Sequence, residues 1–345
     1  MNRLRRRLAA ALALLISCAA CADVKIEGRG APEAAAPAGL FAAPQPWTKD
    51  VSGLAPSERS DAVVGALTSL GGWGNGNRLQ VDFSMPLLVA DAATPRGTIT
   101  APADGYCGGG PDCDPVPLDM PIPADGNAEG SADYTCNTST DDCHVLVVEP
   151  AERRLYELYS STRSGAAHTA RAAFVWDLTK AYPDAMRGEQ CTSADAAGFP
   201  IAGLLPTADE VAAGNVAHAL RFVLPNDRMK SGVYVHPASH AGGPTSDKPD
   251  APPYGARLRL KAAFDETPFD DAERVILRAL KTHGMRLLSD GGEIALTFAD
   301  DRHSTAKWAT LGVAAPSFAA IAPESSEVVD LGPEIPLTFA CARNP

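Results

Sequence analysis

Short apolar segments with the character of β-strands recur along the chain and constrain its fold most strongly. The clearest example is residues 257–264, R-L-R-L-K-A-A-F, where apolar and polar residues alternate with the period of two typical of a strand. Residues 144–149 and 154–159 flank a turn and predict a hairpin. We therefore expect a mainly β fold, a single domain with a β-sandwich or jelly-roll-like core. Further strands are predicted at residues 79–83, 86–89, 172–178, 218–224, 232–236, 286–288 and 293–298, and we expect the last two to pair with each other.

Helical signals are few. Thr207 and Glu210 have the spacing of a capping box and predict a short helix. Asp270 and Glu273 repeat this spacing before a longer apolar stripe, and Gly284 supplies the stop. We expect this one long helix to pack on the edge of the β core.

The N-terminal region has the features of an export signal. Arginines precede an apolar run within residues 1–22, which is too short for a membrane span. Leu15-Ile16-Ser17-Cys18 matches a bacterial lipobox, in which Cys18 becomes acylated; the alternative is ordinary cleavage after Ala22. Residues 23–46 are rich in Ala and Pro and predict a tether, so the domain covers residues 47–345. We expect an outer-membrane or periplasmic lipoprotein, or a secreted protein.

The charge balance excludes one large class of partner. The full chain has 30 basic and 42 acidic side chains, and removal of residues 1–22 leaves 26 basic ones and a net charge of −16. Nucleic-acid binding depends on the neutralisation of phosphates by basic residues. We therefore expect no nucleic-acid partner.

Six of the eight cysteines follow residue 22, and an even number in an exported chain predicts three disulfides. Six cysteines allow fifteen connectivities. Short spacing favours the local pairs Cys107–Cys113 and Cys136–Cys143, each of which would constrain a loop. The third expected pair is then Cys191–Cys341, and the alternative for Cys191 is a reactive thiol.

Several common catalytic signatures are absent, including G-x-S-x-G, H-E-x-x-H, the P-loop and the dinucleotide fingerprint. The candidate catalytic residues are Asp195, His144, His218 and Glu210. Paired carboxylates suit glycoside cleavage, and a histidine beside a carboxylate suits proton abstraction. The alternatives are structural: Asp195 caps a helical turn, Glu210 completes the capping box, and the two histidines are hydrogen-bonded strand ends.

Candidate substrate-binding residues are basic or lie near the histidines. Arg257, Arg259 and Lys261 share one face of a predicted strand, where they would bind an anionic polymer; the alternative is a solvated outer face. His240 and Asp177 are the other two candidates. We expect no metal, because Pro237 prevents a helical i, i+4 pair of His236 and His240.

The blocks HVLVV–LYELY, TSADAAGFPI, DEVAAGNVAHALRF, GARLRLKAAFD and ILRALKTHGM give the chain a family resemblance. With PWTKDVSGL, they resemble blocks that occur in the same order in a family of secreted bacterial and fungal proteins of no established activity. The resemblance covers about residues 47–292 and implies one continuous domain. It favours His144, Asp195, Glu210, His218 and His240 as site residues, and it weakens after Phe298.

These features lead to an expected function. The first hypothesis is an exported carbohydrate-active enzyme, a polysaccharide hydrolase or lyase that acts on an extracellular or cell-wall polymer without a cofactor. The alternative is a non-catalytic surface lipoprotein that binds glycans or cell-wall polymer, and a third possibility is a structural envelope lipoprotein. We expect a monomer that contacts the membrane only through a lipid anchor.

Overall fold

The computed structural model describes residues 39–103, 105–106, 110–290 and 296–344. The chain divides into two units, Met1–Ala36 and Pro37–Pro345, and all described residues belong to the second. The expected signal segment and much of the expected tether lie outside the described residues. Cys107 also lies outside them, so the expected Cys107–Cys113 pair is not tested.

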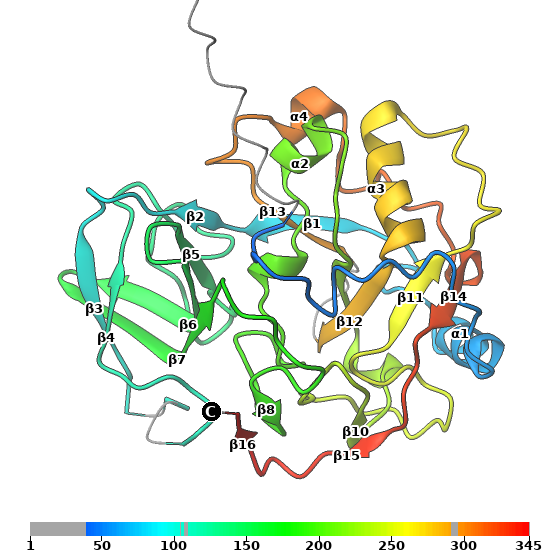
Figure 1. Ribbon diagram of the computed structural model, residues 1–345, viewed down its shortest axis with the longest axis horizontal. Helices are drawn as coiled ribbons and strands as arrows, with labels where there is room; N and C mark the ends of the chain where they lie inside the picture. Colours follow the sequence, from blue (N-terminus) through cyan, green and yellow to red (C-terminus); the bar gives the residue numbers. More distant parts are fainter. Residues whose placement is uncertain (1–38, 104, 107–109, 291–295, 345) are drawn as a thin grey trace, which may run out of the picture. The chain divides into compact units, whose positions relative to one another are not determined.

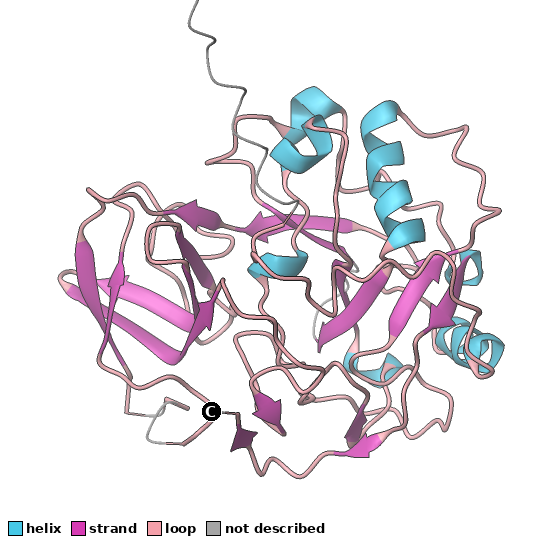
Figure 2. Ribbon diagram, in the orientation of Figure 1, coloured by secondary structure: helices cyan, strands magenta, loops and turns pink. Residues whose placement is uncertain are grey.

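Among the described residues, more lie in strands than in helices, as predicted (Figures 1 and 2). They form two six-stranded sheets and two short strand pairs within the described part of the chain. The first sheet has the order β1 (Val81–Met85), β13 (Leu296–Ala299), β9 (Leu220–Leu224), β12 (Met285–Asp290), β11 (Arg257–Leu260), β14 (Ser326–Val329). The second has the order β2 (Leu87–Val89), β5 (Val145–Glu149), β6 (Arg154–Ser164), β7 (Ala167–Asp177), β3 (Arg96–Thr100), β4 (Leu118–Pro121). The short pairs are β10 (Val233–Tyr234) with β15 (Ile335–Pro336), and β8 (Gly188–Glu189) with β16 (Ala342–Arg343).

The sheets mix parallel and antiparallel pairing. The predicted hairpin is confirmed, since β5 and β6 pair antiparallel around residues 150–153. The expectation that residues 286–288 and 293–298 pair with each other is wrong. Strand β9 lies between β12 and β13, parallel to the first and antiparallel to the second. Strand β9, which is distant in sequence, therefore pairs with both β12 and β13, and these two strands do not pair with each other.

Both faces of the second sheet are buried. On β6 and β7, Leu155 and Trp176 belong to the larger hydrophobic cluster, whereas Tyr156 and Ala173 belong to a smaller one on the opposite face. The larger cluster also contains residues of the first sheet, such as Phe222. This shared core joins the two sheets through apolar packing.

The predicted long helix is α3 (Asp271–Thr282), which lies beside β11 (Figure 1). The Asp270 N–H donates to Glu273, and Gly284 has the positive φ of a helix stop. The shorter helices are α1 (Ser60–Ser69), α2 (Ala208–Ala212), α4 (Trp308–Leu311) and the 3₁₀ turns η1 (Ala202–Leu204), η2 (Asn226–Arg228) and η3 (Pro323–Ser325). Among the described residues, none of these helices combines the length and apolarity that crossing a bilayer requires.

Two of the predicted disulfides are confirmed. Cys136 bonds to Cys143 seven residues later, and Cys191 bonds to Cys341 across a separation of 150 residues. Disulfides form and persist in oxidising surroundings. These two bonds therefore indicate an oxidising, extracytoplasmic environment.

Candidate functional site

A cavity of about 500 Å³ opens where β6 and β7 meet the loop that follows Cys191. Its volume lies within the range of roughly 300–1,000 Å³ typical of small-molecule sites. We call it the aromatic cavity. Its principal lining residues are Tyr106, Asp112, Asp142, His144, Tyr159, Phe174, Ser193, His240 and Phe339.

Aromatic rings line the cavity in two groups. In the first, the Tyr159 ring centroid lies 6.1 Å from that of Tyr106 and 5.5 Å from that of His144. In the second, the rings of His240 and Phe339 are 5.4 Å apart and meet edge to face. The His240 ring is oriented by its Nδ1, which lies 2.8 Å from the backbone oxygen of Ala196. The cavity thus offers apolar ring surfaces in fixed orientations.

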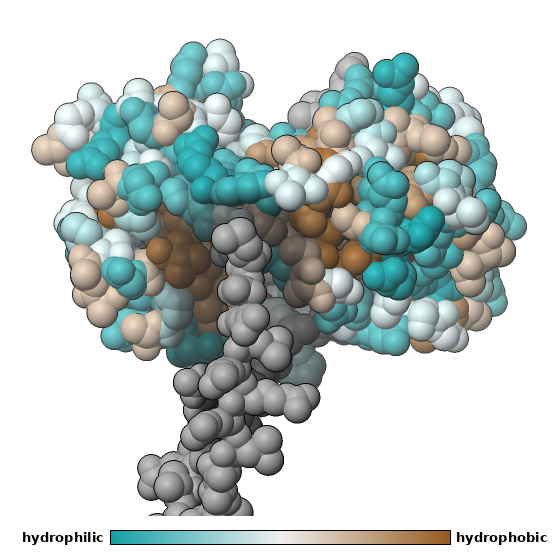
Figure 3. Space-filling model, turned by 90° about the horizontal axis from the view of Figure 1, so that it is seen from above, coloured by the Kyte–Doolittle hydropathy of each residue, from teal (hydrophilic) through white to brown (hydrophobic). Residues whose placement is uncertain are grey.

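The exposure of these rings is unusual for this molecule. On the face in Figure 3, hydrophilic side chains cover much of the surface, and hydrophobic ones gather in its recessed parts. Only four large hydrophobic side chains of the described residues are exposed: Leu54, Val89, Tyr106 and Phe339. Two of the four, exposed by 61% and 65%, line the aromatic cavity. Clustered exposed apolar surface of this kind marks a binding site more often than scattered residues do.

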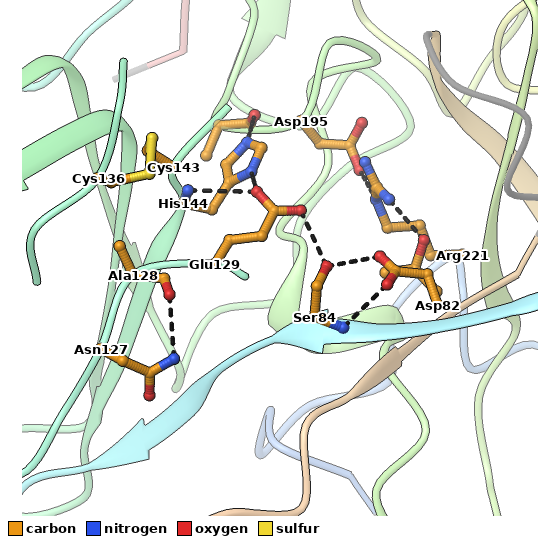
Figure 4. Close-up of polar contacts among 12 residues, drawn as sticks. Asp82, Ser84, Asn127, Ala128, Glu129, Cys136, Cys143, His144, Asp195 and Arg221 are labelled. Carbon is orange, nitrogen blue, oxygen red and sulfur yellow. Dashed lines mark hydrogen bonds and ion pairs between the residues drawn. A yellow bond between two sulfur atoms is a disulfide. The ribbon is translucent and has the colours of Figure 1, made fainter. Parts of the chain in front are cut away.

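A network of ionised side chains lies behind the cavity and meets it at His144 (Figure 4). The His144 ring Nδ1 lies 2.7 Å from Glu129 Oε2, and its Nε2 lies 3.0 Å from the backbone oxygen of Ala194. Both partners are acceptors, so both ring nitrogens must carry a proton. His144 is therefore an imidazolium held between two oxygen atoms.

The pKa values of this pair agree with that assignment. Burial lowers the pKa of His144, but the charge and hydrogen bond of Glu129 outweigh burial and raise it above 6.5. Burial raises the pKa of Glu129, but His144 and more distant Arg221 together lower it to about 2. Ser84 extends the network, since its hydroxyl lies 2.6 Å from Asp82 and 3.4 Å from Glu129 (Figure 4).

Asp195 belongs to the same region but forms its own ion pair. Its Oδ2 accepts a hydrogen bond of 2.7 Å from Arg221 Nε (Figure 4). Arg221 also donates to the Thr297 hydroxyl. The Asp195 side chain is fully buried. Burial raises the pKa of Asp195, against the opposing charge of Arg221. Its carboxylate neutralises a buried arginine, and it is not among the residues that line the aromatic cavity.

The structure places the other two candidate catalytic residues at α2. His218 Nε2 lies 3.5 Å from Glu210 Oε1, and Nδ1 lies 2.9 Å from the backbone oxygen of Ala219. Glu210 also completes the predicted capping box with Thr207, which is confirmed. Among the described residues, the hydrogen bonds and ion pairs of His218 and Glu210 do not reach Asp195 or His144. The four candidates therefore form two groups, only one of which meets the cavity.

The candidate substrate-binding residues are also separated. Arg257 and Arg259 are buried: Arg257 donates to the backbone oxygen of Lys49, and Arg259 pairs with Glu327. Only Lys261 of that row is exposed. His240 lines the aromatic cavity, whereas Asp177 lines a different one.

One group of potential metal ligands occurs among the described residues: Asp112, Cys191 and Cys341. The two sulfur atoms are joined in a disulfide and are not thiolates. Thiolate is the form of cysteine that binds metals. This group therefore lacks the donors that a metal site needs.

Sequence reasoning did not identify Glu129, Arg221, Tyr106 or Phe339. Arg221 carried a usable signal, since a charged residue in the apolar strand LRFVL needs a buried counter-charge. Glu129 lies in a segment rich in Gly and Asp that offers no periodicity.

Comparison of the chain with protein-family models, curated proteins and solved structures found no match.

Proposed function

We propose that the protein binds a carbohydrate chain of an extracellular or cell-wall polymer in the aromatic cavity. The observation that carries this proposal is the position of the two exposed aromatic side chains, Tyr106 and Phe339, at one cavity. A sugar ring has an apolar face of C–H groups and an equator of hydroxyls. Aromatic rings suit the face, and nearby polar groups suit the hydroxyls.

The cavity supplies both kinds of contact. The carboxylates of Asp112 and Asp142 line it together with the rings of Tyr159 and His240. Ionised carboxylates accept hydrogen bonds from several hydroxyls at once. Asp112 is held in place because its Oδ1 accepts a hydrogen bond of 3.1 Å from the Thr192 N–H.

Binding explains the geometry better than proton transfer does. His144 is the member of the buried network that lines the cavity, and its two ring nitrogens are already engaged by Glu129 and Ala194. Asp195 is fully buried against Arg221. Proton transfer to a ligand from either group requires a native hydrogen bond to break first.

The expected export of the chain supports the same proposal. The signal features of residues 1–22, with Cys18 as an acylation site, are those of a lipoprotein or a secreted protein. Such a protein meets polysaccharides in or outside the cell envelope. A lipid on Cys18 would anchor it to a membrane, with a tether shorter than the expected residues 23–46, because Phe41 is buried in the hydrophobic core and packs on Trp47.

Affinity electrophoresis and calorimetry against chitin, cellulose, pectin and peptidoglycan fragments test this proposal. The variants are Tyr106→Ala and Phe339→Ala, with Val89→Ala as the control, because Val89 is similarly exposed (62%) and lies outside the cavity. Each aromatic variant is expected to weaken the binding of one polymer class by about 3- to 10-fold. Absence of binding to every polymer, or equal affinity in all variants, would reject the proposal.

A second candidate, a polysaccharide hydrolase or lyase, is favoured by buried carboxyl groups with raised pKa values near the cavity. Burial raises the pKa of Asp195 and, further, that of Glu157 to about 7. Asp195 is the counter-charge of Arg221, so Glu157 is the carboxyl group that can hold a proton at neutral pH and act as a general acid. Release of reducing sugar from the polymer that binds, or a gain in absorbance at 235 nm for a lyase, would favour this candidate over simple binding.

A further inference from the structure

A second cavity, of about 770 Å³, is lined in part by the last residues of β7 and has a different chemical character. We call it the arginine cavity. Five cationic and three carboxylate side chains line it, an excess of positive charge in a protein whose net charge is −12. The charged residues are Arg153, Arg154, Lys180, Arg187, Arg343, Asp114, Glu152 and Asp177.

Two of the carboxylates already have native partners. Asp114 Oδ2 accepts a hydrogen bond of 2.8 Å from Arg187, and its Oδ1 accepts one from Arg343. Asp177 Oδ1 accepts two hydrogen bonds from Thr179, which lower the pKa of Asp177. Both carboxylates are therefore fixed in position by the protein itself.

Three of the cations lack such partners. Arg153, Arg154 and Lys180 are exposed, and within the described part of the chain their side chains form no hydrogen bond or ion pair. The Asp177 carboxylate, which accepts its hydrogen bonds from Thr179, interacts with Arg154 and Lys180 only through the longer-range attraction that helps to lower its pKa. Cations that no carboxylate holds by a hydrogen bond, gathered around one concave site, attract and retain anions.

The floor of the arginine cavity is rigid. The Arg187 guanidinium lies 4.8 Å from the Phe174 ring centroid and 5.7 Å from that of Trp176. Arg343 is held by β16, which pairs with β8. Gly188 of β8 has φ +140°, and a Cβ there would lie 2.1 Å from the Ala342 carbonyl oxygen. Only glycine allows β16 to approach this closely, so the position of Arg343 depends on it.

We propose that the arginine cavity is a ligand site for an oxyanion group, a carboxylate, phosphate or sulfate carried by a small molecule or by one residue of an acidic saccharide. Guanidinium groups bind these planar or tetrahedral oxyanions through paired N–H donors. The exposed cations would make the new contacts, while Arg187 and Arg343 supply a fixed positive floor. This inference does not depend on what the aromatic cavity binds.

Calorimetry at constant ionic strength tests the site with trigalacturonate, inorganic phosphate and inorganic sulfate as probes. Fully methyl-esterified trigalacturonate is the uncharged comparison. We expect at least one anionic probe to bind and Arg154→Gln/Lys180→Gln to weaken that binding at least about tenfold. The preferred probe identifies the oxyanion.

The control is Arg78→Gln/Arg278→Gln, which removes the same charge from two exposed arginines outside the cavity. It is expected to bind like the wild type. Equal weakening in both double variants would reduce the effect to net charge and overturn the proposal, as would failure of all three anions to bind. Loss of trigalacturonate binding in Tyr106→Ala alone would place the ligand in the aromatic cavity and overturn it too.

Discussion

The imidazole of His144 and the carboxylate of Glu129 form an ion pair with 2.7 Å between Nδ1 and Oε2. Both residues flank the loop that Cys136–Cys143 closes, so this short disulfide and the ion pair stabilise the same connection. The pair also holds the imidazole edge of the aromatic cavity in one orientation. The contribution of this ion pair to stability should be measurable from how the free energy of unfolding changes with pH.

Glu129→Gln should remove a pH-dependent part of the free energy of unfolding. The pKa of Glu129 is about 2, below its usual 4.5, so its contribution is present above pH 4.5 and is lost as the pH falls toward 2. The pKa of His144 is above its usual 6.5, so its contribution is present below pH 6.5 and is lost as the pH rises through the raised value. Between pH 4.5 and 6.5 we expect a loss of roughly 3 kcal/mol.

Guanidinium denaturation of both proteins at several pH values measures this difference. Asp271→Asn is the control, since that carboxylate is fully exposed (100%). A difference between wild type and Glu129→Gln that does not change from pH 2 to pH 8 would contradict the ion pair.

Asp195→Asn should destabilise the protein by roughly 3–5 kcal/mol, because it leaves the buried Arg221 without its counter-charge. Arg221→Met should destabilise the protein by a comparable amount, because it leaves the buried Asp195 carboxylate without its counter-charge. The double variant should be more stable than the sum of the two effects predicts, with a coupling of about 1–3 kcal/mol. Urea denaturation of all four proteins measures the cycle; strictly additive losses would mean that the two charges do not interact.

Glu157 should titrate far above an ordinary glutamate. Its side chain accepts hydrogen bonds from Trp176 Nε1 and the Ala202 N–H, but complete burial outweighs them and raises its pKa to about 7. Since this pKa exceeds the usual 4.5, its contribution to stability is lost as the pH rises from 4.5 toward 7. Carbon-detected NMR of glutamate carboxyl groups, with Glu157→Gln for assignment, should show one midpoint near neutrality. Titration midpoints that lie below pH 5 for all glutamate carboxyl groups would refute the raised pKa of Glu157.

Removal of the long disulfide should affect both stability and binding. Cys191→Ser/Cys341→Ser opens a loop of 150 residues, worth about 5 kcal/mol in the chain-entropy model. Phe339 and Arg343, which flank Cys341, line different cavities, so binding should weaken at each. Thermal denaturation and calorimetry measure the two effects.

Cys136→Ser/Cys143→Ser is the matched comparison for ligand binding in the arginine cavity. Its loop has a separation of only seven residues, worth about 2 kcal/mol in the same model, and it contributes no residue to the arginine cavity. Oxyanion binding should therefore survive in this variant. If oxyanion binding instead survives loss of the long disulfide unchanged, Arg343 has no part in the site.

Local signals in the sequence predicted the local structure well. The mainly β fold, the helix that begins after Asp270, the capping box at Thr207 and the Cys136–Cys143 disulfide all depend on residues close in sequence. The Cys191–Cys341 disulfide, between distant residues, was predicted only as the pair that remained. The order of strands did not follow from such signals. The position of β9 between β12 and β13 results from pairing between segments far apart in the chain.

The candidate site was predicted only in part. His144 and His240 do line a cavity, and Asp195 lies close behind it. The residues that complete the site come from loops with no periodic pattern, such as Glu129 and Tyr106. Arg257 shows the opposite error: an alternating strand identifies which residues share a face, but it does not reveal what covers that face. Here the segment at Lys49 covers it.

The Cys191–Cys341 disulfide also has a consequence for the order of assembly. Phe339 and Arg343, a few residues apart, contribute to one cavity each, and both depend on the bond at Cys341. During synthesis, residues 339–343 emerge about 150 residues after Cys191. Neither cavity is complete until this late segment has arrived and been oxidised. A chain held in a reducing compartment would therefore fold with both cavities incomplete, and it would complete them only in oxidising surroundings.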